Sequence, residues 1–291
     1  MGIPAYNSGL LEYDGDINML KGALETSDRI ITVSPSYAGE LLDPWYAHGM
    51  DRILVTKQHK LTGILNGIDT ELYDPAKDEY TAWHFSKDDL SGKAKCKAEL
   101  LSELELAEGG EPVIGIVTRF VKHKGIDLIR TVFEDIVNEG VKFAILGSGE
   151  KIYEDFFIEM SKRYPDRVSV TTGFVPELAH KIYAGADMFL MPSKIEPCGL
   201  AQLVAMRYGT APIVRETGGL RDTVRDNGGE NGNGFTFMTY DANDMLDAVR
   251  RAKRDYEDKA RWNELVLRMM NCDNSWAKPA DVYIEMFTEV M

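Results

Sequence analysis

Residues 192–220 read PSKIEPCGLAQLVAMRYGTAPIVRETGGL, and the rest of the chain is organised around this stretch. The apolar run Met188–Met191 leads into it and predicts a buried strand. A tight loop with one carboxylate, Glu196, follows, and Gly199–Leu200 then opens a predicted helix that runs to about Tyr208. The unpaired N–H groups at a helix start favour an anion. The stretch therefore predicts a ligand site, in which Glu196 can accept hydrogen bonds from a hydroxyl-rich ligand.

Short apolar runs separated by helical patterns continue on both sides of this stretch, between about residues 92 and 260. The predicted strands are Val113–Val117, Phe143–Leu146, Val168–Val170, Met188–Met191, Ala211–Val214 and Gly234–Phe237. The predicted helices between them are Ile126–Val137, Ile152–Arg163, Glu177–Ala184, Leu200–Tyr208 and Leu220–Arg225. This alternation is typical of an α/β fold with a doubly wound parallel sheet, a Rossmann-like lobe. Such sheets bind ligands at the carboxyl ends of their strands.

The net charge, the length of the apolar runs and the number of cysteines exclude several classes of protein. The chain has 291 residues and a formal net charge of −14, which argues against nucleic acid as a partner because a phosphate backbone requires a basic face. No apolar run approaches the roughly 18 residues that a membrane span needs, so no membrane partner is expected. The three cysteines, Cys96, Cys198 and Cys272, are far apart and odd in number. They argue against a disulfide framework and favour a reducing compartment, so the expected location is cytoplasmic.

Further elements are predicted towards both ends of the chain, outside the alternation of strands and helices. Asn18–Thr26 is predicted to be helical and Arg29–Val33 to be a strand, and Ser36 is predicted to cap a helix that reaches Leu42. The polar stretch Asp74–Ser91 reads as a loop, which places a domain boundary near Asn66–Pro75. Helices are also predicted over Lys93–Leu106, Asp241–Lys253 and Lys259–Met270, and from Ser275-Trp276 to the end of the chain, with Val282, Met286 and Val290 on one face.

Arg119 and Lys124 are the first candidates for ligand binding. The strand Val113–Val117 ends at Thr118-Arg119, and Lys124-Gly125 opens the next helix, so both cations flank one loop at the carboxyl end of the strand. Arginine binds a pyrophosphate through a bidentate fork and lysine acts as a point charge. The alternative is an ordinary basic surface loop.

Two glycine-containing turns follow the next strands. Gly147-Ser148-Gly149 invites a dinucleotide interpretation, but position 152 is Ile where the third glycine of the fingerprint belongs, so a tight strand-to-helix turn is favoured over NAD binding. Thr172-Gly173-Phe174 follows the strand Val168–Val170. Phe174 can pack against a nucleobase and Gly173 can let the backbone approach it. The alternative is that Phe174 belongs to the core.

The remaining candidates give weaker signals. Thr217-Gly218-Gly219-Leu220 precedes a predicted helix, where backbone N–H groups face outward. The five histidines show no metal-ligand spacing, and Cys198 has no evident histidine partner, which argues against a thiol nucleophile. No metal site is predicted.

Several of these motifs together resemble the bacterial glycogen synthase and starch synthase family, which has two Rossmann-like lobes in the GT-B architecture. The similarity extends over nearly the whole chain, from about Leu11 to the final helix. The motifs that carry it are Thr32-Val33-Ser34-Pro35, Ile64-Leu65-Asn66-Gly67-Ile68-Asp69, Arg119-x4-Lys124-Gly125, Glu196-Pro197-Cys198-Gly199-Leu200 and Thr217-Gly218-Gly219-Leu220-Arg221-Asp222-Thr223-Val224.

The resemblance implies retaining transfer of glucose from ADP-glucose to the non-reducing 4-hydroxyl end of an α-1,4-glucan, without a metal or another cofactor. It implies that Arg119 and Lys124 bind the diphosphate and stabilise the leaving ADP, and that Glu196 holds hydroxyls of the donor glucose. The other implied substrate contacts are the N–H groups of Cys198, Gly199 and Leu200, the helix start at Leu200 and Ala201, the adenine site at Gly173 and Phe174, and Asn66 near the transferred sugar. The turn Thr217-Gly218-Gly219 is taken as a further substrate-binding segment.

The chain also departs from the family. The Lys-x-Gly-Gly-Leu-Gly-Asp motif that opens the family's amino-terminal lobe is not in this sequence. The resemblance therefore implies the carboxyl-terminal part of a synthase, with 1–66 as a remnant of the amino-terminal lobe and hinge, 67–275 as the nucleotide-sugar lobe and 276–291 as a helix crossing back. We expect such a fragment to bind ADP weakly, to transfer glucose poorly, and to self-associate or be disordered where apolar faces are uncovered.

Two other functions remain open at this point. The chain can be a non-catalytic nucleotide- or glucan-binding module, or a subunit completed by another polypeptide. It can also be a related GT-B transferase that uses another nucleotide sugar, such as UDP-glucose.

Overall fold

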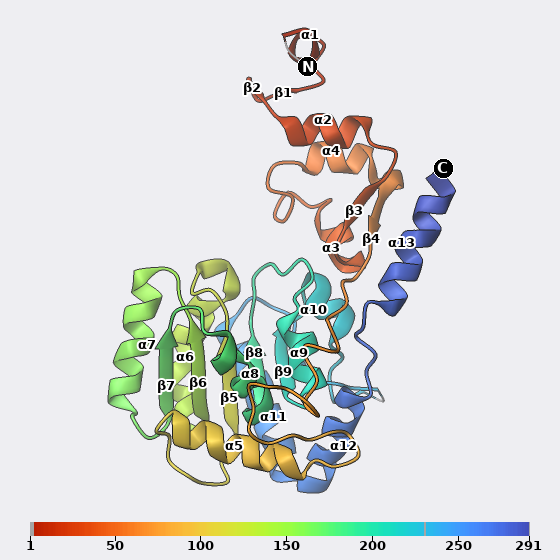
Figure 1. Ribbon diagram of the computed structural model, residues 1–291. Coiled ribbons are helices and arrows are strands. Elements are labelled where there is room, and N and C mark those ends of the chain that lie inside the picture. Colours follow the sequence, from red (N-terminus) through yellow and green to blue (C-terminus); the bar gives the residue numbers. More distant parts are fainter. Residues whose placement is uncertain (1–2, 230, 291) are drawn as a thin grey trace.

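A parallel sheet dominates the computed structural model, which describes residues 3–229 and 231–290. Its six strands have the order β10-β9-β8-β5-β6-β7 (Figure 1). They are β5 (Val113–Val117), β6 (Lys142–Gly147), β7 (Val168–Thr172), β8 (Met188–Met191), β9 (Ala211–Arg215) and β10 (Phe235–Phe237). The chain winds outward from β5 to β7 and then returns to β8 before winding to β10. The topological switch point therefore lies between β5 and β8.

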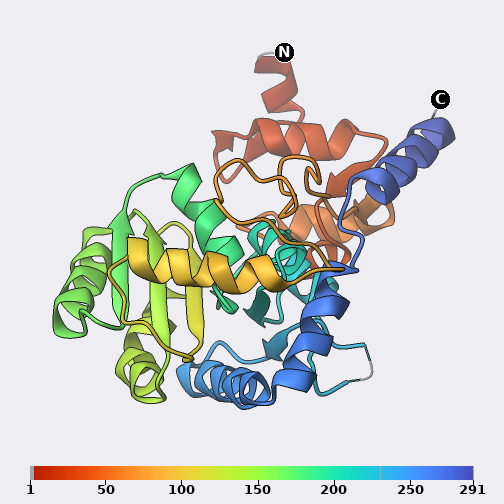
Figure 2. The same ribbon diagram turned by 60° about the horizontal axis from the view of Figure 1, so that its bottom comes forward.

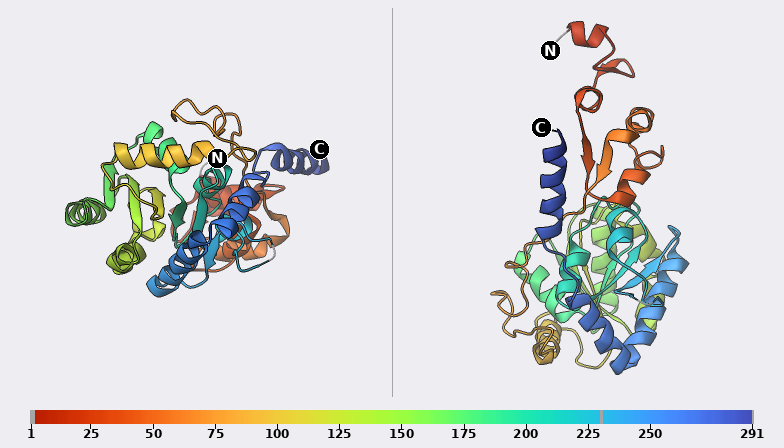
Figure 3. Two further views of the ribbon diagram at one scale, coloured as in Figure 1. Left: turned by 90° about the horizontal axis from the view of Figure 1, so that it is seen from below. Right: turned by 90° about the vertical axis from the view of Figure 1, so that its right-hand side faces the viewer.

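Helices cover both faces of the sheet, as Figures 2 and 3 show. One face packs against α5 (Ser91–Glu103), α8 (Pro176–Gly185), α9 (Ala201–Arg207) and α12 (Lys259–Met270). The other packs against α6 (Ile126–Asn138), α7 (Lys151–Arg163) and α11 (Ala242–Glu257). Because both faces are covered, the residues of β6 are buried throughout, which explains the continuous apolar runs in the sequence. Within the described part of the chain, no helix has the length and apolar character that crossing a bilayer requires.

The predicted α/β doubly wound parallel sheet is confirmed. Every predicted strand between residues 113 and 237 is present, with bounds within two residues of the prediction. The helix predicted over Lys259–Met270 has these bounds, whereas the helix predicted over Leu220–Arg225 begins earlier, as α10 (Gly218–Thr223). A short 3₁₀ turn, η2 (Lys122–Lys124), lies between β5 and α6.

Residues 3–66 form a separate group of short elements, here called the amino-terminal unit. It contains α1 (Ile3–Asn7), β1 (Glu12–Tyr13), β2 (Asp16–Ile17), α2 (Met19–Thr26), β3 (Ile30–Thr32), α3 (Pro35–Glu40), α4 (Asp51–Thr56), the 3₁₀ turn η1 (Gln58–Lys60) and β4 (Leu61–Gly63). Strands β3 and β4 pair in parallel, and the unit has its own small apolar core of Leu24, Ile30, Met50, Ile53 and Leu54. Met1, Gly2 and Met291, the outermost residues of the predicted domains, lie outside the described residues.

The start of α3 differs from the prediction. Ser36 was expected to cap this helix, but Ser34 is the cap, and its hydroxyl accepts a hydrogen bond from the N–H of Tyr37 at 2.9 Å. The reason is Pro35, whose fixed φ and missing N–H suit the first position of a helix. Ser36 therefore lies inside the helix, and its hydroxyl is free to bond elsewhere.

Two chain segments, around Ile68 and Asn274, connect the lobe built on the six-stranded sheet, here called the sheet lobe, to the amino-terminal unit and the final helix. The N–H of Ile68 donates to the carbonyl of Asn274 at 2.8 Å, so the two segments run side by side. Beyond this point the final helix, α13 (Ala277–Val290), extends beside the amino-terminal unit (Figure 3, right). Arg29 and Glu289 form an ion pair there at 3.2 Å. Of the predicted apolar face of α13, only Met286 is buried, whereas Val282 and Val290 are exposed.

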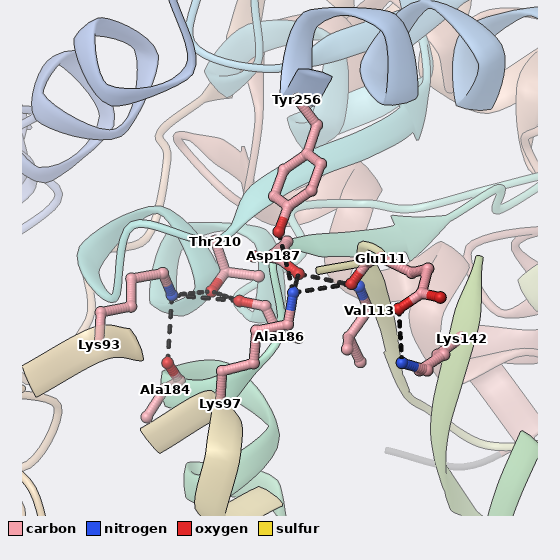
Figure 4. Close-up of polar contacts among 10 residues, drawn as sticks. All are labelled: Lys93, Lys97, Glu111, Val113, Lys142, Ala184, Ala186, Asp187, Thr210 and Tyr256. Carbon is pink, nitrogen blue, oxygen red and sulfur yellow. Dashed lines mark hydrogen bonds and ion pairs between the residues drawn. The ribbon is translucent and has the colours of Figure 1, made fainter. Parts of the chain in front are cut away.

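The amino ends of the strands hold a buried polar network (Figure 4). The ammonium of Lys93 in α5 donates hydrogen bonds to oxygens at or just beyond the carboxyl ends of α8 and α9. The acceptors, at 2.9–3.1 Å, are the carbonyls of Ala184, Ala186 and Tyr208 and the hydroxyl of Thr210. Beside it, Lys97 pairs with Asp187 at 2.6 Å. Since the chain's own oxygens satisfy both cations, this edge of the sheet is tied together internally.

Candidate functional site

A crevice opens at the switch point of the sheet. Strand β5 pairs with β6 over its whole length, but it pairs with β8 only at Ile114–Met188 and Gly115–Phe189. Beyond these pairs the carboxyl ends of β5 and β8 separate. The loops that follow the two strands therefore face each other across a gap, which is where open α/β sheets bind ligands.

Lys124 and Glu196 meet across this crevice. The Lys124 ammonium lies 2.5 Å from Glu196 Oε2, and the Ser193 hydroxyl donates to the same oxygen at 3.0 Å. Glu196 is only 6% exposed, so its charge is balanced by a lysine rather than by water. The second carboxylate oxygen, Oε1, has no hydrogen-bond partner within residues 3–229 and 231–290. It is the oxygen that a ligand hydroxyl can reach.

Arg119 lies on the same loop after β5 as Lys124. It lines a cavity of about 250 Å³ together with the backbone of Gly147 and Ser148 and the segment that carries Gly173 and Phe174. Phe174 is 91% exposed, which excludes the alternative that it belongs to the core. Gly173 has a φ of 126°, a backbone conformation that favours glycine. The residues that line the cavity thus include a cation, Arg119, and an open aromatic ring, Phe174.

The glycines of the turn after β6 serve packing rather than a dinucleotide. A Cβ at Gly147 would lie 1.9 Å from the carbonyl oxygen of Thr118, and one at Gly149 would lie 2.3 Å from the carbonyl oxygen of Phe120. The absence of side chains lets this turn lie against the Arg119 loop, in agreement with the predicted tight strand-to-helix turn.

The loop after β8 places the other predicted residues close to Glu196. Cys198 is buried, and burial raises the pKa of its thiol, while the backbone N–H of Asn66 donates to it. A protonated, buried thiol is a poor nucleophile. Leu200 is 47% exposed, and Ala201 begins α9. Asn66 thus contacts the loop that carries Glu196 and Cys198, although Asn66 lies far from this loop in the sequence.

The turn Thr217–Gly219 lies behind the Glu196 loop. The N–H of Gly219 donates to the carbonyls of Glu196 at 3.1 Å and Pro197 at 3.2 Å. Thr217 is fully buried, and its hydroxyl and the N–H of Gly218 both donate to the carboxylate of Glu40, at 3.0 and 2.8 Å. These groups are therefore occupied by the chain itself: the N–H of Gly219 holds the Glu196 loop, whereas Thr217 and Gly218 hold Glu40 of α3.

Glu40 belongs to a reciprocal contact between α3 and α10. While Glu40 of α3 accepts at the start of α10, Asp222 of α10 accepts at the start of α3. Asp222 receives hydrogen bonds from the hydroxyls of Ser34 and Ser36 at 2.5 Å and from the N–H of Ser36 at 3.0 Å. A carboxylate at a helix start is favourable because it satisfies unpaired N–H groups. This contact, here called the α3–α10 contact, joins the amino-terminal unit to the sheet lobe.

The structure places the predicted turns at one edge of the sheet. The loops 119–124, 173–174, 196–201 and 217–219 all follow the carboxyl ends of parallel strands. Direct contacts link Lys124 to Glu196 and Gly219 to Glu196, and the cavity links Arg119 to Phe174. The expectation that these turns converge is therefore confirmed.

Sequence reasoning missed Ser193, Glu40 and Gln202. Ser193 lies three residues before Glu196 in the same loop, so its spacing was available as a signal. Glu40 meets Thr217 across 177 positions, and no local pattern indicates that contact. His123 lies in η2, where burial and the neighbouring Lys124 and Arg119 lower its pKa.

Known proteins resemble this chain over most of its length. Residues 99–266 match the family model described as glycosyl transferases group 1, and residues 1–56 match the starch synthase catalytic domain. A glycogen synthase of Anoxybacillus flavithermus is 48% identical over 284 residues, which are 97% of this chain and 59% of that protein. A glycogen synthase of Bacillus cereus is 46% identical over 294 residues, covering 100% of this chain and 62% of that protein. The chain thus spans about three-fifths of the length of these curated relatives.

A solved structure agrees with these matches. The catalytic domain of starch synthase IV from Arabidopsis thaliana, bound to ADP and acarbose, has a TM-score of 0.89 and 37% identity and covers 94% of this chain and 58% of that chain. The resemblance to glycogen and starch synthases and to the GT-B fold is confirmed. Because the matched residues 99–266 make up more than half of the sequence, the chain belongs to the glycosyl transferases of group 1.

Proposed function

We propose that this chain carries the nucleotide-sugar site of a glycogen or starch synthase. The reaction is the transfer of glucose from ADP-glucose to the non-reducing 4-hydroxyl end of an α-1,4-glucan, with retention at the anomeric carbon. The observation that carries the proposal is the 2.5 Å contact between Lys124 and Glu196 at the switch point, beside the cavity of Arg119 and Phe174. The glycogen synthases among the relatives and the starch synthase bound to ADP support it.

Arg119 and Lys124 bind the diphosphate in this proposal. Both lie on one loop at the carboxyl end of β5, and Lys124 is held in place by Glu196. Their two positive charges neutralise the diphosphate locally in a chain whose net charge is −14. The exposed ring of Phe174 stacks on the adenine, and Gly173 leaves room for the base.

Glu196 and the loop after it hold the donor glucose. Glu196 Oε2 is occupied by Lys124 and Ser193, so Oε1 accepts hydrogen bonds from sugar hydroxyls. The N–H groups of Cys198, Gly199 and Leu200 assist, with Leu200 and Ala201 facing phosphate at the start of α9. Asn66 approaches the transferred sugar, and the turn Thr217-Gly218-Gly219 lies behind the loop, which Gly219 holds.

The chemistry follows from this arrangement. The bond between the anomeric carbon and the diphosphate oxygen breaks, and negative charge develops on the leaving ADP. Arg119 and Lys124 are positioned to stabilise that charge, a kind of interaction that commonly accounts for about 10²–10³ in rate per group. We propose that these two side chains suffice for the diphosphate, with no metal or other cofactor. The acceptor oxygen then bonds to the same face of the sugar that ADP leaves, and the proton of the acceptor hydroxyl passes to the departing diphosphate.

We also propose that the protein works in the cytoplasm, on a soluble donor and a glucan acceptor. The three cysteines are free thiols, as a reducing compartment requires.

Two measurements on the 291-residue chain test the proposal. Isothermal titration calorimetry with ADP, ADP-glucose and UDP-glucose reports binding, and transfer of labelled glucose to maltooligosaccharides reports activity. We expect ADP and ADP-glucose to bind weakly, with the label appearing slowly in a glucan lengthened at its non-reducing end. Failure of ADP to bind would refute the proposed site, and tighter binding of UDP-glucose would indicate another donor. Binding of ADP without any transfer would identify a nucleotide-binding module instead.

A further inference from the structure

We propose that Gln202 is a positioning residue that aims the backbone N–H groups of Gly199 and Leu200 into the donor crevice. The inference rests on the proposed function, in which these N–H groups contact the nucleotide sugar. Gln202 has no exposed surface, so it acts on the ligand through the loop rather than by direct contact.

The side-chain amide of Gln202 connects the loop to a neighbouring helix. Its Nε2 donates to the carbonyls of Cys198 and Gly199 at 3.1 and 3.0 Å and to the hydroxyl of Thr223 in α10 at 3.2 Å. Turning the amide over would place Oε1 against the two carbonyl oxygens, which repel it. The observed orientation is therefore the favoured one.

Two peptide planes are fixed by these contacts. In a trans peptide unit the N–H points away from the C=O of the same unit. Because the carbonyls of Cys198 and Gly199 point at Gln202, the N–H groups of Gly199 and Leu200 point to the opposite side. Neither N–H has a hydrogen-bond acceptor within residues 3–229 and 231–290. Both remain available to a ligand beside Glu196.

The loop backbone fits this purpose. Gly199 has a φ of 71°, which favours glycine, and a Cβ there would lie 2.4 Å from Gln202 Oε1. A side chain at this position would push the amide away from the loop. The glycine and the glutamine are thus a matched pair.

The arrangement also leaves a buried polar atom without a partner. Gln202 Oε1 is fully occluded and has no donor among the described residues. Such an atom destabilises the folded state, and unsatisfied buried groups of this kind require an explanation. The explanation here is that Nε2 must face the two carbonyls, which leaves Oε1 on the side that offers no donor.

Substitution of Gln202 tests the inference. Gln202→Met keeps the length of the side chain but removes both hydrogen bonds to the loop. We expect at least a tenfold rise in the Kd of ADP, and faster hydrogen–deuterium exchange across residues 196–201. The matched control is Asn227→Leu, because Asn227 is a buried amide bonded to Asp255 and Arg268 away from the crevice. The control should lose comparable stability and keep the Kd of ADP within twofold.

Thr223 provides a milder pair of variants if Gln202→Met does not fold. Thr223→Val removes one acceptor of the amide and should raise the Kd of ADP about threefold, whereas Thr223→Ser should restore it. A folded Gln202→Met protein that binds ADP like the wild type and shows unchanged exchange across residues 196–201 would overturn the inference. Should the wild type itself not bind ADP, the proposed function fails, and the exchange comparison alone still decides whether Gln202 orients the loop.

Discussion

Lys124 is the residue on which the donor site depends most. Its ammonium balances the buried Glu196 carboxylate and also faces the place proposed for the diphosphate. Removing it leaves Glu196 buried without a counter-charge, which destabilises a folded protein unless the carboxylate takes up a proton. Both consequences lower activity: phosphate binding is lost, and the Glu196 carboxylate loses its counter-charge or becomes protonated.

The variant Lys124→Gln should reduce transfer from ADP-glucose by about 10²–10³, because one charged group that stabilises the leaving ADP is lost. The control is Lys122→Gln, an exposed lysine of the same loop that forms no ion pair within the described residues. Initial rates with labelled ADP-glucose provide the measurement. Equal losses in both variants would show that the general charge of the loop matters rather than the Lys124–Glu196 contact.

At the scale of elements, the strands could be predicted and the contacts between distant helices could not. Buried parallel strands are continuous apolar runs, so β5–β10 were visible in the sequence. The short elements α1, β1, β2 and α4 were missed because so few residues carry little periodicity. The parallel topology also predicted that the loops after these strands meet at one edge of the sheet. Glu40 and Thr217 are 177 positions apart in the sequence, so no local pattern could predict their contact.

The α3–α10 contact should contribute measurably to stability. In Asp222→Ala, the hydroxyls of Ser34 and Ser36 and one backbone N–H lose their acceptor. We expect the free energy of unfolding in urea to fall by about 1–3 kcal/mol, as for other buried groups left unpaired. Asp247→Ala, which breaks an exposed ion pair on α11, should change it by less than about 0.5 kcal/mol. Equal effects would show that the contact is only a surface pair.

Lys93 should make stability depend on pH at alkaline values. Burial lowers the pKa of Lys93 to about 8 in the folded protein, below its ordinary value of 10.5. Between these two values the unfolded chain binds more protons, so the contribution of Lys93 to stability increases with pH by up to about 1.4 kcal/mol per unit. We therefore expect the unfolding free energy of the wild type, minus that of Lys93→Met, to increase from pH 8 to pH 10. A constant gap would contradict the lowered pKa.

At the scale of the whole molecule, apolar surface is concentrated on the elements above the sheet lobe. Ile284 and Phe287 of α13 are 63% and 54% exposed, and Met19 and Leu20 of α2 are each 57% exposed. Monomeric proteins rarely leave large apolar patches uncovered. These faces are therefore the parts of the described chain most prone to bind another protein surface.

We predict that the 291-residue chain self-associates through α13. Ile284→Lys and Phe287→Lys should shift the sedimentation coefficient towards that of a monomer, because a charge in an apolar contact is strongly unfavourable. Glu285→Lys adds positive charge to the same helix at an exposed position that faces away from these two side chains, because residues one or two positions apart on a helix do not face each other, and it should change little. A wild-type chain that sediments as a monomer at all concentrations would refute the prediction.

The central claim is that the loops at the switch point jointly hold a sugar diphosphate, and a crystal structure of the chain with ADP tests it most directly. The account predicts the diphosphate within hydrogen-bond distance of both Arg119 and Lys124, with the adenine on the ring of Phe174. ADP bound elsewhere, for example at the opposite edge of the sheet beside Lys97, would contradict it.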